Sequence, residues 1–467
     1  MLALELIDSG LVLARQSGQA VELLAESPGV AILEERTTIT GEDAARRVRR
    51  SPLLAQSNFW RGLSTEPLTR PSQATQTSAD IAFAHADALL RKWRDAESRI
   101  LVALPGGYSR EQLGLLLGVI NETGVSVAGL VDAALAACSM DSGPARVLHL
   151  DLELHQAILT VLEYVGGDRA GLKRSRYEIA LQHGLVAIQQ SWIEFIADTF
   201  IRKTRFDPLH DANNEQQLVD QLPHWLAQLQ ANDRINISMP LADRTPEIEL
   251  KRDELIAAGQ QHYSELVRLV QGARVAGLPI ELRVSHRVAA LPGLLDRLGS
   301  LRDCTIKVLP KGAAALGALH HESAIARSAD SLALVYFLPS AALSETPDQV
   351  AKFEPTPPAL RPTHVLYQGR AWKISDQPLT LGWTSAPGKR QLLLPGSLPG
   401  ISRAHCTLVR QNGAVLVEDH STYGSFVNDE RVHGRTTLAV GDRLRVGTPG
   451  ITLDLIQMVD DHGAPQD

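Results

Sequence analysis

The sequence predicts an α/β region followed by an all-β region, joined by a short proline-rich segment. Strand-like apolar runs alternate with helix-period runs over residues 1–340, whereas residues 363–458 hold only short strand-like runs separated by turn residues. Residues 341–362 contain five prolines among polar side chains, and proline favours extended backbone. We therefore expect a first domain at 1–340, a semi-rigid linker at 341–362, a second domain at 363–458 and a disordered tail at 459–467.

The overall composition is that of a soluble globular protein with several domains. The 467 residues suffice for about three domain-sized units. Hydrophobic residues make up 44% and charged residues 21% of the chain, which argues against wholesale disorder and against a membrane bundle. A formal charge of −7 repels a phosphate backbone, so we expect no nucleic-acid partner. Apolar runs fall far short of the ~20 residues that span a bilayer, so we expect no membrane insertion.

The cysteines argue against a metal site and for a reducing compartment. Cys138, Cys304 and Cys406 are far apart without C-x-x-C spacing, so neither a zinc site nor a disulfide framework is predicted. The first ten residues carry Glu5 and Asp8 and no Lys or Arg, the reverse of a secretory leader. We expect a cytoplasmic protein without a resident metal.

Within the first region, individual elements follow from the period of the apolar residues. Helices are expected around residues 83–93 and 185–195, where apolar side chains recur every three or four positions and would face a core. Strands are expected at four short runs bounded by turn or polar residues: 100–104, 147–150, 280–284 and 306–309.

A pattern at the start of the chain recurs further along. The run LALELIDSGLVLAR places Asp8 after one strand-like run, and a turn with Gly10 before the next. The run RVLHLDLELHQAILTVLE places Asp151 in the same position between two strand-like runs. The repeat predicts a duplicated fold with one acid in each half. Two unrelated hairpins that each carry an acid are the alternative.

The two hairpins belong to a longer series of segments. A strand and Gly-x-x-Ala helix at 27–62, a Leu-Pro strand end with an Ala-rich helix at 100–138, a strand, loop and helix at 281–298 and a Gly-Ala helix at 308–321 follow in order. The first region thereby resembles the actin-like ATPase superfamily, and most closely the nucleotide-binding domain of the seventy-kilodalton heat-shock chaperones. The resemblance implies a duplicated, ribonuclease-H-like bilobed α/β fold. It also implies two hairpin turns that hold ATP phosphates through backbone N–H groups, with a carboxylate in each half organising Mg²⁺.

This chain keeps part of that nucleotide site and loses part of it. Asp8, Gly10 and Asp151 stand at the matching turns, and Gly312 precedes the closing Gly-Ala helix. Glu153 stands where the family's second hairpin carries glycine, so it would place a negative charge beside the phosphates. At a separation of about 4 Å and an effective dielectric constant of about 20, such a repulsion costs about 4 kcal/mol.

The adenosine-binding loop departs as well. Its Gly-Gly pair is replaced by Ser285 and His286, although Pro292 keeps its expected place. We therefore predict a pseudo-ATPase with no catalytic residue and no cofactor. Its vestigial nucleotide-binding residues would be Asp8, Gly10, Asp151 and Gly312. The alternative is a weak ATPase or conformational switch that still binds ATP with Mg²⁺.

The second region carries spaced motifs along its whole length. They are Leu381-Gly382, Ser402-Arg403-x-His405, Asp419-x-Ser421-Thr422-x-Gly424-Ser425-Phe426-Val427-Asn428, Gly441-Asp442 and Gly447. With these motifs residues 363–458 resemble a forkhead-associated (FHA) domain, a β-sandwich whose loops at one end bind phosphothreonine peptides. The resemblance implies a threonine-phosphorylated protein partner.

The same resemblance assigns phosphate contacts to loop residues. Ser402 and Thr422 match positions that touch the phosphate, and Arg403 adds charge beside Ser402. A phosphate dianion favours such guanidinium and hydroxyl donors. His405 is expected to order the loop rather than to bind the ligand.

Two residues that the FHA family uses on this surface are replaced. Trp383 stands where an arginine usually follows the first glycine, and Tyr423 stands where an asparagine usually holds the peptide backbone. Losing the arginine removes roughly 1.5–3 kcal/mol of binding free energy. Lys389, Arg390 or Arg403 are candidates to replace it in part. The aromatic pair is equally typical of a phosphate-independent docking patch and of packing at the sandwich edge.

The two regions together predict a non-enzymatic adaptor. A pseudo-ATPase lobe would carry an FHA domain that recruits a protein partner, with or without a phosphothreonine, through an altered surface. The rival hypothesis is an ATP-dependent switch in which the first region signals to the FHA domain. The predicted partner-binding residues are Ser402, Arg403, Thr422, Trp383, Tyr423 and Arg390.

Overall fold

The computed structural model divides the chain into two compact units, residues 1–345 and 346–467. It describes residues 1–326, 333–339 and 362–457, apart from 19, 95, 142, 144–145, 167–169, 275–278, 368–369, 385–389, 395–399, 412–413, 428–429, 433, 439, 441 and 448–449. The predicted linker lies outside the described residues except for its last position, and the predicted tail lies wholly outside them. In the described part of the chain, no helix is long and apolar enough to cross a membrane.

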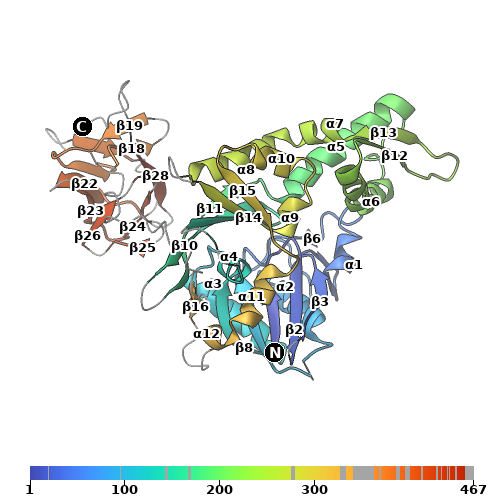
Figure 1. The fold of residues 1–467 in the computed structure, drawn as a ribbon, viewed down its shortest axis with the longest axis horizontal. Helices are drawn as coiled ribbons and strands as arrows, with labels where there is room; N and C mark the ends of the chain where they lie inside the picture. The colour runs from blue at the N-terminus through green and yellow to red at the C-terminus, as the bar shows by residue number, and fades with distance from the viewer. Residues whose placement is uncertain are drawn as a thin grey trace, which may run out of the picture. The chain divides into compact units, whose positions relative to one another are not determined.

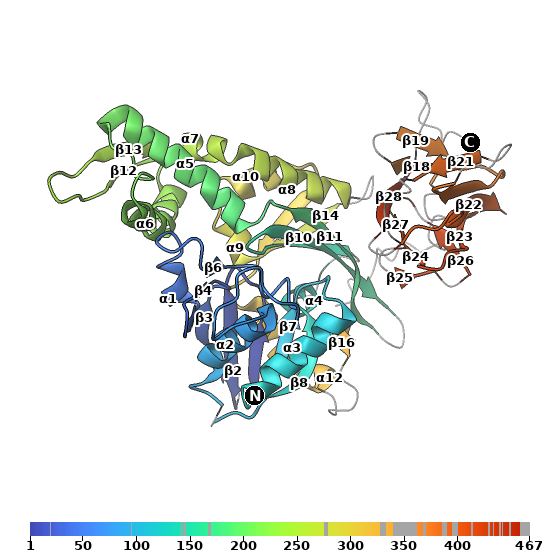
Figure 2. The ribbon, with the colours of Figure 1, turned by 180° about the vertical axis from the view of Figure 1, so that it is seen from behind.

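The first lobe of the first unit is built on a six-stranded sheet in the order β16-β8-β7-β1-β2-β3. Its strands are β1 (Leu2–Glu5), β2 (Leu11–Ser17), β3 (Ala20–Ser27), β7 (Arg99–Leu104), β8 (Ser126–Asp132) and β16 (Leu334–Val335). Helices α2 (Ser78–Leu90) and α3 (Arg110–Glu122) cover one face, and α4 (Ala133–Cys138) and α11 (Ala313–His320) the other (Figures 1 and 2). Both α2 and α3 begin at capping boxes, with Thr77 and Ser109 as N-caps, which satisfy backbone donors that a helix start leaves unpaired.

Smaller elements complete this lobe. They are the small sheet β4 (Ala31–Leu33), β5 (Thr38–Thr40) and β6 (Ala55–Gln56), with the short helices α1 (Glu42–Ala45) and α12 (Glu322–Ile325).

The second lobe is built on another six-stranded sheet, in the order β15-β14-β9-β10-β11-β17. Its strands are β9 (Arg146–Leu152), β10 (Gln156–Val165), β11 (Gly171–Leu181), β14 (Ile280–Val284), β15 (Cys304–Val308) and β17 (Phe337–Pro339). Helices α5 (Leu185–Thr204), α7 (Arg252–Ala258), α8 (Gln260–Gly272) and α10 (Leu294–Gly299) lie on the side away from the first lobe (Figures 1 and 2). The remaining elements are α6 (Ala212–Ala231), the hairpin β12 (Arg234–Ser238) and β13 (Glu247–Lys251), and α9 (His286–Ala289). Buried Trp192, Phe200 and Tyr263 fill the core between the sheet and these helices.

The two sheets of the first unit share one topology. In each, three consecutive strands pair antiparallel, and the first of them pairs parallel with a fourth strand that is parallel to a fifth. Both predicted hairpins are present, as β1–β2 and β9–β10. Asp8 lies in the turn of the first hairpin, whereas Asp151 lies within β9, one residue before its end. The four predicted strands correspond to β7, β9, β14 and β15, and the two predicted helices to α2 and α5.

The second unit is a β-sandwich of two sheets. One sheet has the order β19-β18-β28-β27-β24-β25, and the other β21-β20-β22-β23-β26. Their strands are β18 (His364–Tyr367), β19 (Arg370–Lys373), β20 (Leu379–Gly382), β21 (Arg390–Leu393), β22 (Cys406–Gln411), β23 (Ala414–Asp419), β24 (Ser425–Val427), β25 (Glu430–Arg431), β26 (Arg435–Leu438), β27 (Arg443–Val446) and β28 (Ile451–Ile456). Alternate residues such as Leu379 and Leu381 point inward and pack in one apolar core, as the period of two predicts.

Helices α4 and α11 pack unusually closely in the middle of the first unit. Both are rich in alanine, and a Cβ atom placed on Gly317 of α11 would lie 1.9 Å from the carbonyl oxygen of Ala136 in α4. The backbones can approach to this distance only because Gly317 has no side chain.

Replacing Gly317 by alanine should therefore lower the free energy of unfolding by about 1–3 kcal/mol, the usual cost of overpacking a core. Gly114→Ala is the matched control, because Gly114 lies on an exposed face of α3 with open space at its Cβ position. It should raise the free energy of unfolding by about 0.5–1 kcal/mol. Urea denaturation of both variants measures the two effects, and equal changes would contradict the close packing.

Candidate functional site

The turns of the two repeated hairpins meet between the lobes of the first unit. The backbone N–H of Leu154 donates to Oδ1 of Asp8 at 2.7 Å, and the hydroxyl of Ser9 donates to the carbonyl of Leu152 at 2.5 Å. Asp8, Asp151 and Glu153 are all buried at this junction. The structure thus brings the two predicted acids together, but the turns bind each other directly.

Arg287, from helix α9, fills the centre of this junction. Its Nη2 donates to Oε1 of Glu5 at 2.7 Å and to the carbonyl of Gly10 at 2.6 Å, and its Nη1 lies 3.4 Å from Oδ2 of Asp151. Burial alone lowers the pKa of Arg287, but the carboxylates of Asp151 and Glu5 outweigh it, so the pKa is raised and the guanidinium stays charged. The positive charge that neutralises Glu5 and Asp151 is therefore supplied by Arg287, a residue of the chain itself.

Little space remains around the Arg287 guanidinium. A cavity of about 10 Å³ lies there, lined in part by Asp151, Ser285 and His286. That volume is enough for about one water molecule. This cavity is too small to hold ATP.

The predicted glycines also lie around this junction. Gly10 supplies the carbonyl that Arg287 binds. Gly312 has a φ of 73° and forms the N-cap of α11, whose residue Ala314 donates its backbone N–H to Oε2 of Glu5 at 2.9 Å. Gly10 therefore takes part in the contact between the lobes, whereas Gly312 begins a helix of the first lobe that binds Glu5.

Two carboxyl groups at the junction have raised pKa values. Burial raises the pKa of Asp8 to about 6, against the opposing effects of the Leu154 N–H group and Arg287. Burial, and next the charge of Asp8, raise the pKa of Glu153 to about 8. The Glu153 side chain is 3% exposed and accepts a hydrogen bond from Gln156 at 2.5 Å. At neutral pH Glu153 is then mostly protonated and uncharged. It would therefore not repel ATP phosphates in the way that the sequence predicted.

A second bridge joins the lobes away from the hairpin turns. Arg49, after α1, donates through Nη1 to Glu215 and through Nη2 to Gln190, each at 3.0 Å. Its backbone N–H donates at 2.9 Å to Gln216, which is fully buried. Sequence reasoning missed both Arg49 and Arg287, because a single arginine has no periodic or motif pattern.

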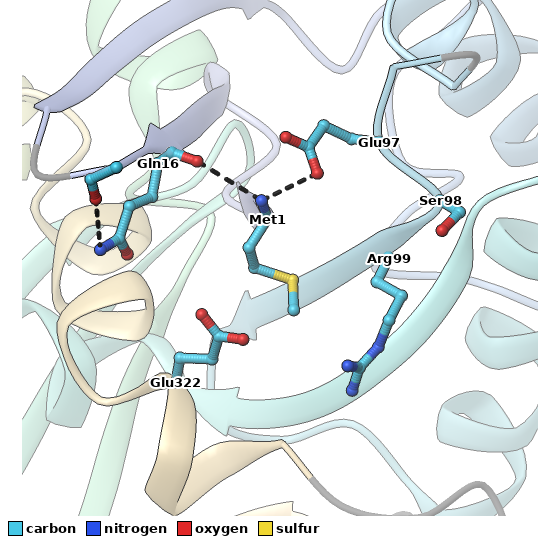
Figure 3. A pocket seen from close by; sticks show the side chains of 7 residues that line it. Met1, Gln16, Glu97, Ser98, Arg99 and Glu322 are labelled. Atoms are coloured by element: carbon cyan, nitrogen blue, oxygen red, sulfur yellow. Dashed lines mark hydrogen bonds and ion pairs between the residues drawn. The ribbon is translucent and has the colours of Figure 1, made fainter.

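A surface hollow of about 380 Å³ lies elsewhere on the first unit, at residues 1, 16, 18, 97–99 and 322 (Figure 3). The amino group of Met1 occupies its centre, 2.8 Å from Oε2 of Glu97 and 3.4 Å from the carbonyl of Gln16. Among the described residues, no group of three or more His, Cys, Asp or Glu side chains is placed to hold a metal ion. This hollow contains none of the predicted site residues.

Three loops lie side by side at one end of the second unit. The backbone N–H of Thr384 donates to the carbonyl of Arg403 at 3.2 Å, which joins the loop after β20 to the loop before β22. The N–H of Thr422 lies 3.4 Å from the hydroxyl of Ser402, which joins that loop to the one after β23. Arg403 and Thr422 are exposed and Ser402 is half-buried. The structure therefore brings the three predicted phosphate contacts together.

A buried histidine holds two of these loops. Nδ1 of His405 accepts from the N–H of Ser402 at 2.9 Å, so its proton lies on Nε2, which donates to the carbonyl of Gly424 at 3.0 Å. Burial lowers the pKa of His405, which keeps the ring neutral. His405 is 0% exposed, so it orders the loops and does not face a ligand, as expected.

A carboxylate organises the third loop. Oδ1 of Asp419 accepts from the hydroxyls of Ser421 and Ser425, each at 2.8 Å, and the hydroxyl of Ser421 accepts from the N–H of Gly424 at 2.7 Å. Burial alone raises the pKa of Asp419, but these hydroxyl and backbone donors outweigh it, so the pKa is lowered. The loop that carries Thr422 is thus fixed before any ligand binds.

Of the other predicted partner-binding residues, two lie on the clustered loops and one does not. Trp383 and Tyr423 lie on the clustered loops and are 44% and 53% exposed. Arg390 lies elsewhere, because it pairs with Leu379 at the start of β20, about 10 Å of strand away from Gly382. Its guanidinium donates to the hydroxyl of Ser375 at 2.6 Å and to backbone carbonyls. Arg390 therefore does not reach the loops, and Lys389 lies outside the described residues.

The second unit is therefore a β-sandwich with preordered loops that present hydroxyl and guanidinium donors at one end. Residues 387–447 match the sequence model of the FHA domain. An FHA domain supports protein–protein interaction through phosphothreonine-containing partners. Among curated proteins, none matches the chain.

Glu153→Gln should change how stability depends on pH. A carboxyl whose pKa is raised on folding stabilises the fold while it is protonated, and this contribution is lost as the pH rises through the folded pKa. The pKa of Glu153 rises from its ordinary 4.5 to about 8. The free energy of unfolding of the wild type, relative to Glu153→Gln, should therefore fall between about pH 5 and pH 8.

Urea denaturation across this pH range measures that difference. Glu163→Gln is the control, since it removes an exposed carboxyl group from β10, the strand that follows the turn with Glu153, and it should keep the wild-type profile. A constant difference between the wild type and Glu153→Gln would show that Glu153 is not buried in the protonated form.

Proposed function

We propose that this protein is a non-enzymatic adaptor that recruits a threonine-phosphorylated protein through the loops of its FHA domain. The observation that carries the proposal is the exposed group of Ser402, Arg403 and Thr422 on loops that His405 and Asp419 hold in place. A phosphate with three acceptor oxygens matches two hydroxyls and one guanidinium.

The charge of this region supports an anionic ligand. Residues 363–458 contain ten Lys or Arg and seven Asp or Glu, a formal charge of +3, whereas the whole chain carries −7. Trp383 stands in place of the arginine that the FHA family usually has here. Arg403 is therefore the arginine that remains on the described parts of the three loops. We expect binding that depends on phosphate but is weaker than with two arginines, by about ten- to a hundredfold.

The first unit is proposed to be a pseudo-ATPase of the actin-like class. The shared topology of its two sheets, with Asp8 in the turn of one hairpin and Asp151 near the end of the first strand of the other, supports the class. Arg287 among Glu5, Gly10 and Asp151 supports the loss of nucleotide binding, because it fills the junction and supplies its own positive charge. The alternative, an ATP-binding switch, requires the lobes to separate against both Arg287 and Arg49.

Replacing Ser402 and Arg403 together by alanine should reduce partner capture by about ten- to a hundredfold, since charge-assisted hydrogen bonds are worth roughly 1.5–3 kcal/mol. Full-length chain serves as bait in a lysate of the source cells, with and without phosphatase treatment. Phosphatase should abolish capture by the wild type.

Arg443→Ala is the matched control, because Arg443 is an exposed arginine at the opposite end of β27 from Val446, which pairs with Ser425. It should leave capture unchanged. Capture that survives phosphatase treatment and the loss of both loop residues would contradict the phosphate-dependent adaptor.

ATP with Mg²⁺ should leave the melting temperature of the full chain unchanged, because a ligand raises stability only when its concentration exceeds its dissociation constant. Differential scanning fluorimetry at millimolar ATP measures this. A clear rise in the melting temperature that disappears in Asp8→Ala would support the ATP-binding switch instead.

A further inference from the structure

The first lobe of the first unit presents two exposed leucines on an ordered loop. Leu53 and Leu54 are 69% and 43% exposed and lie between α1 and β6. The N–H of Leu54 donates to the carbonyl of Ser51 at 3.0 Å, and the carbonyl of Leu54 accepts from the N–H of Leu33 in β4 at 2.9 Å. Both leucines are therefore exposed on a backbone that hydrogen bonds hold in place. Exposed apolar side chains that gather in one place mark interaction sites.

The Arg49 bridge connects this loop to an apolar side chain of the second lobe. Arg49 lies four residues before Leu53, and its Nη2 donates to Gln190 of α5 at 3.0 Å. Val186 is exposed, lies one turn before Gln190 and shares its face of α5. The two leucines and Val186 therefore lie on opposite sides of a hydrogen bond between the lobes.

A second contact places Leu181 at the same boundary between the lobes. The hydroxyl of Ser57, three residues after Leu54, lies 2.9 Å from Nε2 of His155 in the second lobe. The carbonyl of His155 accepts from the N–H of Gln182 at 2.9 Å, and Leu181, which is exposed, directly precedes Gln182. The four exposed apolar side chains along this boundary are called the seam patch: Leu53, Leu54, Leu181 and Val186.

The charges beside the seam patch have opposite signs on the two lobes. Residues 42–54 contain four arginines and two acids, a formal charge of +2, and Arg50 is exposed among them. Residues 181–201 contain two acids, Glu194 and Asp198, and no Lys or Arg, a formal charge of −2. Both of these acids are exposed. A copy of the chain turned by 180° about an axis through the patch sets the basic side of each copy against the acidic side of the other.

We propose that the seam patch is the interface of a twofold-symmetric dimer of this chain. A second copy fits this surface because it supplies apolar side chains and the opposite order of charges, whereas a partner of one charge would match only one lobe. In the dimer each copy covers the boundary between the lobes of the other, so the lobes separate only after the dimer dissociates. The dimer also carries two FHA domains, which increases the avidity for a partner with two ligand sites.

Sedimentation velocity of the full chain over a range of concentrations tests the dimer. The wild type should change from monomer to dimer as its concentration rises. Leu53→Glu should raise the dissociation constant of the dimer about tenfold or more, because it places a charge in the apolar part of the interface. Leu181→Glu tests the other lobe at an equally exposed position and should have the same effect.

Val165→Glu is the matched control for these two variants. Val165 is also an exposed apolar residue of the first unit, but it ends β10, about 30 Å of strand away from the His155 turn. It should dimerise like the wild type. Thermal melts of all variants verify folding, which exposed positions should tolerate.

An exchange of charges tests the twofold symmetry. Arg50→Glu and Asp198→Arg should each weaken self-association about tenfold, because each variant sets like charges against each other in its own dimer. An equal mixture of the two variants should recover the dimer, since the altered side of one variant then meets the opposite charge on the other. A fluorescent label on one variant detects this mixed dimer in the same sedimentation experiment.

Several outcomes would overturn the proposed interface. A wild type that stays monomeric at every concentration would reject the dimer. A dimer that survives both Leu53→Glu and Leu181→Glu, or that Val165→Glu weakens equally, would place the interface elsewhere on the chain. Two charge variants that stay monomeric when mixed would reject the twofold pairing of the lobes.

Discussion

The buried guanidinium of Arg287 is the interaction on which the first unit depends. It neutralises Glu5 and Asp151 in a space that excludes bulk water, and Glu5 in turn binds the first turn of α11. Removing one member of such a buried charge group usually costs about 3–5 kcal/mol, because the remaining charges stay buried without a partner. The lobes are therefore closed by the chain itself, where a bilobed nucleotide-binding protein would close around its ligand.

We infer from this closure that the two units have different tasks. The junction of the first unit has hydrogen-bonded turns, a filled centre and a second bridge at Arg49. In the second unit, the hydroxyl and guanidinium donors at the loop end are exposed instead. The loops that carry them are held by hydrogen bonds of the His405 and Asp419 side chains. Preordered, exposed donors reduce the entropy lost on binding. We therefore propose that recognition is concentrated in the FHA domain and that the first unit acts as a rigid carrier.

The sequence predicted those features that local patterns encode. Period-two and period-3.6 apolar runs located β7, β9, β14, α2 and α5, because burial of one face imposes those periods. The FHA motifs predicted that Ser402 and Thr422 lie close together, because such motifs determine the local backbone geometry of the loops. The partners of Arg287 are 136 and 282 residues away in the chain, so no local pattern could predict that contact.

Strand register explains the errors and omissions in the second unit. Arg390 and Leu393 belong to the same short strand, but only Leu393 is level with Gly382 and the loops. Register depends on pairing across the sheet, and the motif spacing gave no information on it. Arg390 therefore lies away from the three loops where it was expected, and the level position of the strand is Leu393, which no motif singled out.

Hydrogen–deuterium exchange of the full chain tests the division of tasks most directly. We predict that a phosphothreonine peptide slows amide exchange at residues 401–405 and 420–424, and that ATP with Mg²⁺ slows it neither there nor at residues 8–10, 151–154 and 285–287. Protection of the hairpin turns by ATP, or unchanged exchange in the FHA loops with every phosphothreonine peptide, would contradict the account.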